Sequence, residues 1–240
     1  MSQNTTQSTE AMFSTIADRY DRCNLLFSLG VDRCWRKRLA RSLGLDADDT
    51  ALDICCGTGD MAFALLKHTP VRMVHAFDCS ERMIQLAQEK RMRCTARRWM
   101  GGKTLRLGVQ DAGRLSLKPG QFDAVTCVFG LRNIADRAAV FARVMDVLTP
   151  GGRLGVLEFS LPARHLLRGV YGVYLSRVMP LAGRAVLGQA EPLRYLARSI
   201  YHWHHNVSLA EELAEAGFAA IRSQPLTGGI VTMTVAEKPV

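Results

Sequence analysis

The stretch 53–60, Asp-Ile-Cys-Cys-Gly-Thr-Gly-Asp, has the residue types and spacing of a ligand-binding loop. Asp53 ends a short apolar run that predicts a buried strand, and Gly57 and Gly59 bracket Thr58 just before a predicted helix. Glycines at such a turn let the backbone approach a ligand closely. Because doubly wound folds bind ligands at the carboxyl edge of their parallel strands, this loop is the first candidate binding site.

The charge around this loop separates two classes of ligand. Its glycine spacing also fits the G-x-G-x-x-G/A pattern of dinucleotide-binding loops, so spacing alone does not exclude NAD. A pyrophosphate gains nothing from carboxylates, whereas Asp53 and Asp60 flank this loop and residues 51–66 contain no Lys or Arg. S-adenosylmethionine carries a cationic sulfonium and an ammonium group, which suit an acidic loop. The charge therefore favours S-adenosylmethionine.

Acidic residues also follow the next two predicted strands. Asp78 ends the second strand, where its carboxylate is expected to bind both ribose hydroxyls, as the equivalent residue does in NAD enzymes. Asp111 and Ala112 follow the third strand, and we expect them to contact the adenine through the carboxylate and the backbone. A capping role at the strand end is the alternative for Asp111.

Strands and helices alternate through most of the chain, which predicts a parallel sheet covered on both faces. Strands are expected over 50–54, 71–78, 105–110, 122–129 and 153–159, with helices near 60–67, 80–94 and 136–148 between them. Ser80 and Asp136 are the predicted N-caps, and Ser208 with Glu211 predicts a capping box. The last two strands, over 220–225 and 230–238, are joined by a Gly-Gly turn, which makes them an antiparallel hairpin.

The 240 residues suit one α/β domain over 11–240, preceded by a polar and disordered tail over 1–10. We expect an N-terminal helical cap over 11–45, with an apolar stripe that ends at Tyr20, and a helical insertion over 163–205. The tail has no apolar core of a secretory signal, so a cytoplasmic protein is expected.

The seven cysteines show no C-x-x-C spacing, so neither a metal site nor a disulfide framework is expected. They are interpreted as free thiols, several of which act as small hydrophobic residues at strand ends.

The net charge of +9 predicts attraction to an anionic partner. Six arginines and a single glutamate lie between Arg164 and Arg198, interleaved with apolar residues. Arg177 interrupts the longest apolar run, which is too short and too polar to span a bilayer. A basic amphipathic segment on an anionic inner-membrane surface fits this pattern, and a solvated helical cap over a pocket is the alternative.

Several segments together resemble the ubiquinone/menaquinone biosynthesis C-methyltransferases. They are Met12-Phe13, Arg19-Tyr20-Asp21 with Asn24, Gly57-Thr58-Gly59-Asp60, Phe129-Gly130-Leu131-Arg132-Asn133, Pro150-Gly151-Gly152-Arg153, Leu157-Glu158-Phe159-Ser160, Arg194-Tyr195-Leu196 with Ser199-Ile200, Ala216-Gly217-Phe218 and Gly228-Gly229-Ile230-Val231. Phe-Gly-Leu-Arg-Asn and Arg-Tyr-Asp-x-x-Asn are the most specific of these motifs.

The resemblance implies a Rossmann-like class I methyltransferase fold, with a mostly parallel seven-stranded sheet. It also implies S-adenosylmethionine as methyl donor and a polyprenylated hydroquinone as acceptor. By position, Thr58, Asp78, Asp111 and Ala112 would contact the cofactor. Val128 stands where many members have a cofactor-binding serine, so only a backbone contact is expected there. The chain also departs from the family pattern at Cys55-Cys56, Gly188-Gln189, Leu193 and residues 202–205.

Methylation of a quinol ring needs alignment with the donor and a nucleophilic ring carbon, which deprotonation of the hydroquinone provides. Arg132 keeps its charge and is predicted to stabilise the phenolate or to order a water molecule. Asn133 is predicted to orient the ring oxygen, with a turn role as the alternative. Tyr20 and Asn24 are predicted to close the pocket, with a role as a core tyrosine as the alternative for Tyr20. The histidines at 202, 204 and 205 are candidates for the base, with exposed loop residues as the alternative.

Three other functions remain open at the level of sequence: a nucleic-acid methyltransferase, an NAD-dependent oxidoreductase and a non-catalytic cofactor-binding scaffold. The basic residues lie in an apolar amphipathic stretch rather than an aromatic-studded groove, so no nucleic-acid partner is expected. A naphthoquinol acceptor is favoured, alone or together with a benzoquinol. The sequence is also compatible with a homodimer.

Overall fold

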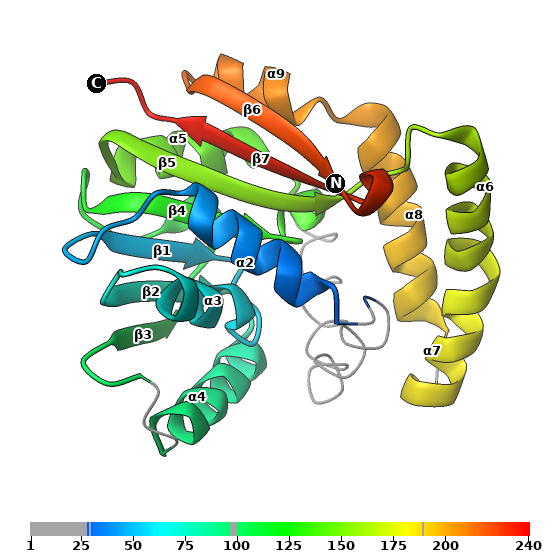
Figure 1. Cartoon of the computed structure of the whole chain (residues 1–240), viewed down its shortest axis with the longest axis horizontal. Coiled ribbons are helices and arrows are strands. Elements are labelled where there is room, and N and C mark those ends of the chain that lie inside the picture. Colours follow the sequence, from blue (N-terminus) through cyan, green and yellow to red (C-terminus); the bar gives the residue numbers. More distant parts are fainter. Residues whose placement is uncertain (1–27, 29, 97–99, 189) are drawn as a thin grey trace.

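The computed structural model describes residues 28, 30–96, 100–188 and 190–240. A sheet of seven strands lies at its centre, in the order β3-β2-β1-β4-β5-β7-β6 (Figure 1). The strands are β1 Thr50–Ile54, β2 Met73–Asp78, β3 Thr104–Val109, β4 Phe122–Val128, β5 Leu148–Phe159, β6 Ala219–Leu226 and β7 Val231–Glu237. The predicted mostly parallel sheet is confirmed, because β1 to β5 pair in parallel.

The predicted C-terminal hairpin is also confirmed. Strand β7 runs antiparallel to β5 and to β6, and it inserts between them. The turn that joins β6 to β7 contains Gly228 and Gly229, as the sequence predicted, and both have positive φ.

Strand β5 starts earlier than the expected residue 153. Leu148 already pairs with Phe122, and the register shifts before Ala124 pairs with Arg153. The Pro-Gly-Gly segment therefore forms an irregularity within a long strand rather than a break before a short one.

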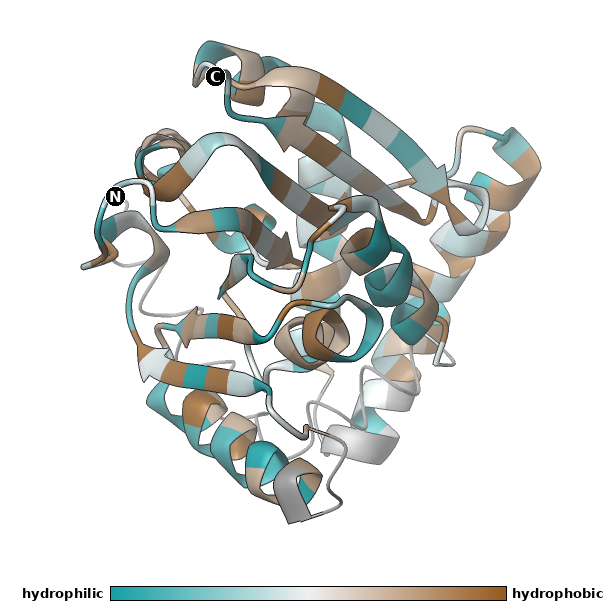
Figure 2. Ribbon diagram, turned by 60° about the vertical axis from the view of Figure 1, so that its left-hand side comes forward, coloured by the Kyte–Doolittle hydropathy of each residue, from teal (hydrophilic) through white to brown (hydrophobic). Residues whose placement is uncertain are grey.

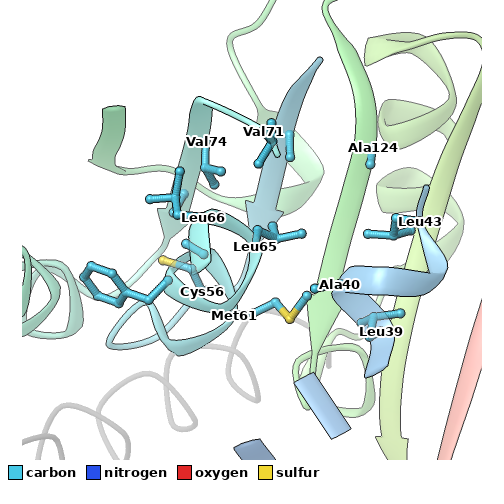
Figure 3. Close-up of a cluster of buried hydrophobic side chains, with 14 of the residues drawn as sticks. Leu39, Ala40, Leu43, Cys56, Met61, Leu65, Leu66, Val71, Val74 and Ala124 are labelled. Carbon is cyan, nitrogen blue, oxygen red and sulfur yellow. The ribbon is translucent and has the colours of Figure 1, made fainter. Parts of the chain in front are cut away.

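Helices cover both faces of the sheet (Figure 1). They are α2 Asp32–Ser42, α3 Asp60–His68, α4 Glu81–Ala96, α5 Arg137–Val147, α6 His165–Val173, α7 Met179–Leu187, α8 Glu191–Asn206 and α9 Leu209–Glu215. One core, shown in Figure 3, packs Leu39 of α2 and Leu65 of α3 against Val74 and Ala124 of the sheet. A second core packs α5 and α9 against the other face through Phe141 and Leu213, among others.

The central strands are mostly apolar, with a few polar residues among them, as Figure 2 shows. Strand β1 is almost entirely buried, whereas the edge strand β6 is mostly exposed. This difference follows from position, since a strand covered by helices on both faces must be apolar along its whole length.

Helix caps agree with the sequence in two of three cases. The Asp136 side chain accepts a hydrogen bond from the Ala139 N–H (3.0 Å), and Ser80 Oγ accepts one from the Met83 N–H (3.4 Å). The predicted capping box is wrong, because the Ser208 side chain makes no capping bond at the start of α9. That helix is held instead by Glu212, which pairs with Arg137 of α5.

Helices α6, α7 and α8 fall within the predicted insertion 163–205, and a π-helical turn, η3 Tyr174–Val178, joins the first two. They stand beyond the carboxyl ends of β4 and β5 (Figure 1). A separate cluster that includes Tyr171, Leu175 and Ile200 holds them together. None of the helices in the described part of the chain is long and apolar enough to cross a membrane.

Candidate active site

The glycine loop connects β1 to α3 and lies at the carboxyl edge of the sheet. Gly57 (φ 53°) and Gly59 (φ 84°) both have left-handed backbone conformations, and Gly59 is the N-cap of α3. A Cβ on Gly59 would lie 3.3 Å from the Phe63 ring. The spacing of these glycines is therefore required by the turn itself.

Asp78, at the end of β2, lies directly beside this loop. Its Oδ2 accepts a hydrogen bond from the Gly57 N–H (2.8 Å), and its Oδ1 accepts one from the Ser80 N–H (2.9 Å). The structure therefore brings Asp78 and the glycine loop together as the sequence predicted. The contact of Asp78 with a ribose stays a prediction.

Asp53 is completely buried at the end of β1. Its Oδ1 accepts a hydrogen bond from Thr126 Oγ1 of β4 (2.7 Å), whereas its Oδ2 has no hydrogen-bond partner. Burial raises the pKa of Asp53 to about 7, although Thr126 and the positive charge of Arg36 oppose this rise. The carboxylate is thus held without a full set of partners at the edge of the site.

The loop is less acidic than its sequence neighbourhood indicated. Lys90 of α4 donates to Asp60 Oδ1 (2.7 Å) and to Thr58 Oγ1 (3.0 Å). Burial opposes the ionisation of Asp60, but Lys90 and then Arg36 outweigh it, so its pKa is lowered. Residues 51–66 contain no Lys or Arg, but the fold brings Lys90 of α4 and Arg36 of α2 close to Asp60.

Asp111 is exposed and caps a short helical turn, η1 Ala112–Arg114, by accepting a hydrogen bond from the Gly113 N–H (2.7 Å). This is the capping role that the sequence left open, and it occupies only one carboxylate oxygen. Ala112 follows it in the same turn. Val128, the last residue of β4, is half-buried. The cofactor contacts of these three residues stay predictions.

Arg132 lies in a second helical turn, η2 Leu131–Asn133, and pairs with Glu158 of β5. The Arg132 guanidinium donates to Glu158 Oε2 (2.8 Å) and to the Phe129 carbonyl (3.0 Å), and the two side chains are 6% and 2% exposed. Its Nε donates to Ser199 Oγ of α8 (3.3 Å). Glu158 was not predicted as a site residue, although a carboxylate inside an apolar strand run is a signal that could have found it.

Two aromatic rings connect Arg132 to the N-terminal helix. Phe129 and Phe159 stack with ring centroids 4.3 Å apart. The Arg132 guanidinium lies 5.3 Å from the Phe159 ring, and that of Arg36 lies 5.6 Å from the Phe129 ring. The stack therefore has a cation near each ring, one on α2 and one on η2.

Gly130 explains part of the Phe-Gly-Leu-Arg-Asn motif. A Cβ at this position would lie 2.6 Å from the Cys55 Cβ and 3.0 Å from the Cys127 sulfur. Residue 130 must therefore be a glycine, because a side chain there would collide with Cys55 of the glycine loop. A hydrogen bond with Cys127 and burial raise the pKa of the Cys55 thiol, and burial raises that of Cys56, so neither is a reactive thiolate.

Asn133 accepts a hydrogen bond from the Tyr195 hydroxyl of α8 (3.0 Å). Tyr195 was not predicted as a site residue, although it lies in one of the segments that carry the family resemblance. His202 and His205 are exposed on α8. Tyr20 and Asn24 lie outside the described residues. Within the described residues, no three His, Cys, Asp or Glu side chains form a group that could hold a metal ion.

Comparison with known families decides the class of protein. A model described as the ubiE/COQ5 methyltransferase family matches residues 1–238. The chain belongs to this family. It is therefore an S-adenosylmethionine-dependent methyltransferase, and the cofactor predicted from the loop is confirmed.

Proteins of known name match this chain along nearly its whole length. A demethylmenaquinone methyltransferase from Deinococcus radiodurans is 38% identical, over 97% of this chain and 93% of that protein. One from Staphylococcus aureus is 34% identical, over 95% of this chain and 91% of that protein.

Solved structures confirm the class I methyltransferase fold. A putative S-adenosyl-L-methionine-dependent methyltransferase from Methanococcus maripaludis superposes with a TM-score of 0.63 at 16% identity, over 93% of this chain and 92% of that chain. Phosphoethanolamine N-methyltransferase 2 from Haemonchus contortus, in complex with S-adenosyl-L-methionine, has a TM-score of 0.62 at 16% identity, over 86% of this chain and 52% of that chain.

Proposed function

We propose that this protein methylates a ring carbon of a polyprenylated hydroquinone, with demethylmenaquinol as the principal acceptor and menaquinol as the product. The observation that carries this proposal is the match to proteins named demethylmenaquinone methyltransferase, at 34–38% identity over about 95% of the chain. A ubiquinone-precursor benzoquinol is a second candidate acceptor.

In the proposed reaction, bound S-adenosylmethionine supplies an electrophilic methyl group. Loss of a hydroquinone proton places negative charge on the ring oxygen and, by delocalisation, on the adjacent carbon. Arg132 stabilises the oxygen charge, and Glu158 fixes the position of its guanidinium. Asn133, oriented by Tyr195, positions the ring oxygen. As the ring carbon bonds to the methyl carbon, the sulfonium–methyl bond breaks and S-adenosylhomocysteine is the leaving group. The ring proton then leaves to solvent and aromaticity returns.

The cofactor residues of the proposal are Asp53, Gly57, Thr58, Gly59, Asp78, Asp111, Ala112 and Val128. Tyr20 and Asn24 are proposed to contact the substrate. Proximity to the cofactor loop supports the proposal for Asp78, because Gly57 donates directly to its carboxylate.

We also propose that the protein is cytoplasmic and binds the anionic surface of the inner membrane through the insertion. Large apolar side chains on α6, η3 and α7 are exposed: Leu166 (84%), Val170 (63%), Val173 (52%), Val178 (49%) and Leu181 (67%). Exposed arginines, including Arg177 and Arg184, lie on the same elements, and exposed Arg164 is the N-cap of α6. Apolar residues with basic neighbours are typical of helices that lie in a membrane interface. A homodimer stays a prediction, which sedimentation equilibrium would test.

The acceptor is tested with purified protein and reduced short-chain substrates. We expect methylation of a demethylnaphthoquinol, detected by mass spectrometry as a gain of one methyl group on carbon. If only the benzoquinol is methylated, the proposed acceptor is wrong and the protein acts in ubiquinone synthesis instead. Methylation of neither quinol, with bound cofactor, would overturn the proposal. Accumulation of the demethyl quinone after gene deletion is the matching test in cells.

A further inference from the structure

Arg132 has three of its five N–H donors held by the protein, and these contacts fix the whole guanidinium. Nη1 donates to Glu158 Oε2 (2.8 Å) and to the Phe129 carbonyl (3.0 Å), and Nε donates to Ser199 Oγ (3.3 Å). A guanidinium is a planar and rigid fork, so contacts on both sides prevent it from swinging. The two N–H groups of Nη2 make no hydrogen bond with the described residues.

The Nη2 donors keep contact with solvent, although the Arg132 side chain is only 6% exposed. In the described part of the chain, the buried polar atoms without a partner are Nε of Arg36 and Oδ2 of Asp53, and Arg132 Nη2 is not one of them. Nη2 is therefore the nitrogen of this guanidinium that a ligand can reach. Two N–H donors on one charged group suit an oxygen that carries negative charge.

Ser199 is suited to accept from Arg132, because its own hydroxyl hydrogen is used elsewhere. The hydroxyl donates to the Leu196 carbonyl of α8 (2.8 Å), so its lone pairs are left for the Arg132 Nε–H. Tyr195 lies four residues earlier on the same face of the helix, and its hydroxyl donates to Asn133 Oδ1 (3.0 Å). One face of α8 thus contacts both side chains that are proposed to act on the quinol oxygen.

We propose that Ser199 is a positioning residue, which holds Arg132 so that Nη2 stabilises the phenolate oxygen of the quinol. The proposal rests on the proposed quinol methylation, and it adds the nitrogen that meets the substrate and the side chain that aims it. Glu158 holds one side of the guanidinium and Ser199 holds the other. Without the contact to Ser199 the positive charge remains, but its distance to the ring oxygen is no longer fixed.

The first test measures kcat of Ser199→Ala against pH, with a reduced short-chain quinol. A guanidinium that is no longer held stabilises the phenolate less, so the pKa of the bound quinol hydroxyl should rise and the acid limb of the profile should move to higher pH. We expect kcat to fall on the order of tenfold at about pH 6 and to approach the wild-type value at about pH 9. The variant removes no charge, and it keeps the titratable neighbours of Arg132, among them Glu158 of β5, Tyr171 of α6 and Tyr195 of α8. The affinity for S-adenosylhomocysteine should stay unchanged.

Ser176→Ala is the matched control, because the exposed Ser176 hydroxyl also donates to a carbonyl of its own helical segment, that of Val173 (3.5 Å). It should leave the pH profile unchanged. Ser199→Thr keeps the hydroxyl and should regain most of the lost kcat. A fall of kcat by the same factor at every pH, or a Thr variant as slow as the Ala variant, would mean that Ser199 only supports the helix, and the proposal would be overturned. An unchanged profile in Ser199→Ala would overturn it as well.

A second test needs no turnover. It follows the Arg132 Nε–H resonance of ¹⁵N-labelled protein, which is assigned by its absence in Arg132→Lys. This proton should exchange with water at least about tenfold faster in Ser199→Ala than in the wild type or in Ser176→Ala. Equal exchange rates would show that Ser199 does not hold the guanidinium. Faster exchange in a protein that methylates no quinol would support Ser199 as the positioning residue of Arg132 and count against the proposed acceptor alone.

Discussion

Arg132 combines an observed structural contact with a proposed chemical role. Its guanidinium pairs with Glu158 in a nearly solvent-free environment, so the ion pair is part of the fold around the site. Removing one partner of a buried ion pair leaves an uncompensated charge and costs about 3–5 kcal/mol. A loss of turnover in a simple Arg132 variant therefore does not by itself show that Arg132 contacts the substrate.

A pair of variants separates these two roles. Arg132→Met should destabilise the protein by several kcal/mol and abolish turnover, whereas Arg132→Met combined with Glu158→Gln should regain much of the stability, because no buried charge remains unpaired. Turnover should stay lost in the double variant if the guanidinium stabilises the phenolate. Urea denaturation and a quinol methylation assay measure the two properties. Recovery of turnover together with stability would show that Arg132 has only a structural role.

Because burial raises the pKa of the Asp53 carboxyl group, the stability of the protein should depend on pH. Its pKa is raised from 3.8 to about 7 by burial, so folding favours the protonated form. The associated stability is fully present below about pH 4 and is lost as the pH rises through 7. Asp53→Asn removes this loss, so the ligand-free variant should melt several degrees above wild type at pH 8 and close to wild type at pH 4.5. Calorimetry of both proteins at the two pH values tests this. An equal difference at both values would contradict the predicted ionisation.

At the scale of elements, the sequence predicted the sheet and most helices because apolar runs and helical stripes record local burial. Strand β1 matches its predicted bounds, and the Asp136 and Ser80 caps were found. Strand β5 was predicted too short, because pairing of Leu148 with Phe122 extends it through a Pro-Gly-Gly irregularity. Local pattern does not show that pairing.

The site was predictable only in part, for the same reason. The glycine loop and Asp78 are adjacent because both follow parallel strands, a rule that applies to any such sheet. The contacts of Lys90 with Asp60 and of Arg132 with Glu158 join residues far apart in sequence. Nothing in the spacing of those residues specifies which cation meets which carboxylate.

Gly130, just after β4, lies against Cys55 of the glycine loop, and this close approach predicts that a change in one segment affects the other. Gly130→Ala would place a Cβ 2.6 Å from the Cys55 Cβ, so the loop must move. We expect a destabilisation of about 1–3 kcal/mol, the usual cost of overpacking, together with weaker binding of S-adenosylhomocysteine. Gly102→Ala is not a suitable control because Gly102 has positive φ, whereas Gly169→Ala is, since no atom lies within 4 Å of its added Cβ. Unchanged cofactor affinity in Gly130→Ala would show that the two loops are not coupled.

At the scale of the whole molecule, the insertion stands beyond the carboxyl ends of β4 and β5 (Figure 1), and its exposed apolar side chains lie on α6, η3 and α7. Leu166, Val170 and Val173 recur at the spacing of one helical face, and Leu181 continues the exposed apolar surface on α7. Inward-facing residues of the same helices, such as Tyr171 and Leu175, form their own buried cluster. The arrangement allows the outer face to enter a lipid interface while the inner cluster packs against α8, which contacts Arg132 through Ser199 and Asn133 through Tyr195.

If this face binds the membrane, negative charges introduced into it should weaken vesicle binding without changing catalysis. Leu166→Glu combined with Val170→Glu should lower binding to vesicles of anionic phospholipid at least about tenfold, because two apolar side chains no longer enter the interface. Turnover of a short-chain, water-soluble quinol should not change. Met92→Glu is the control for Leu166→Glu alone, because both single variants change the net charge equally and Met92 is 62% exposed on α4, outside the insertion. Vesicle co-sedimentation at low and high salt measures the effect, and added salt should weaken the wild type further through its arginines. Equal losses in Met92→Glu and Leu166→Glu would instead indicate a general effect of net charge.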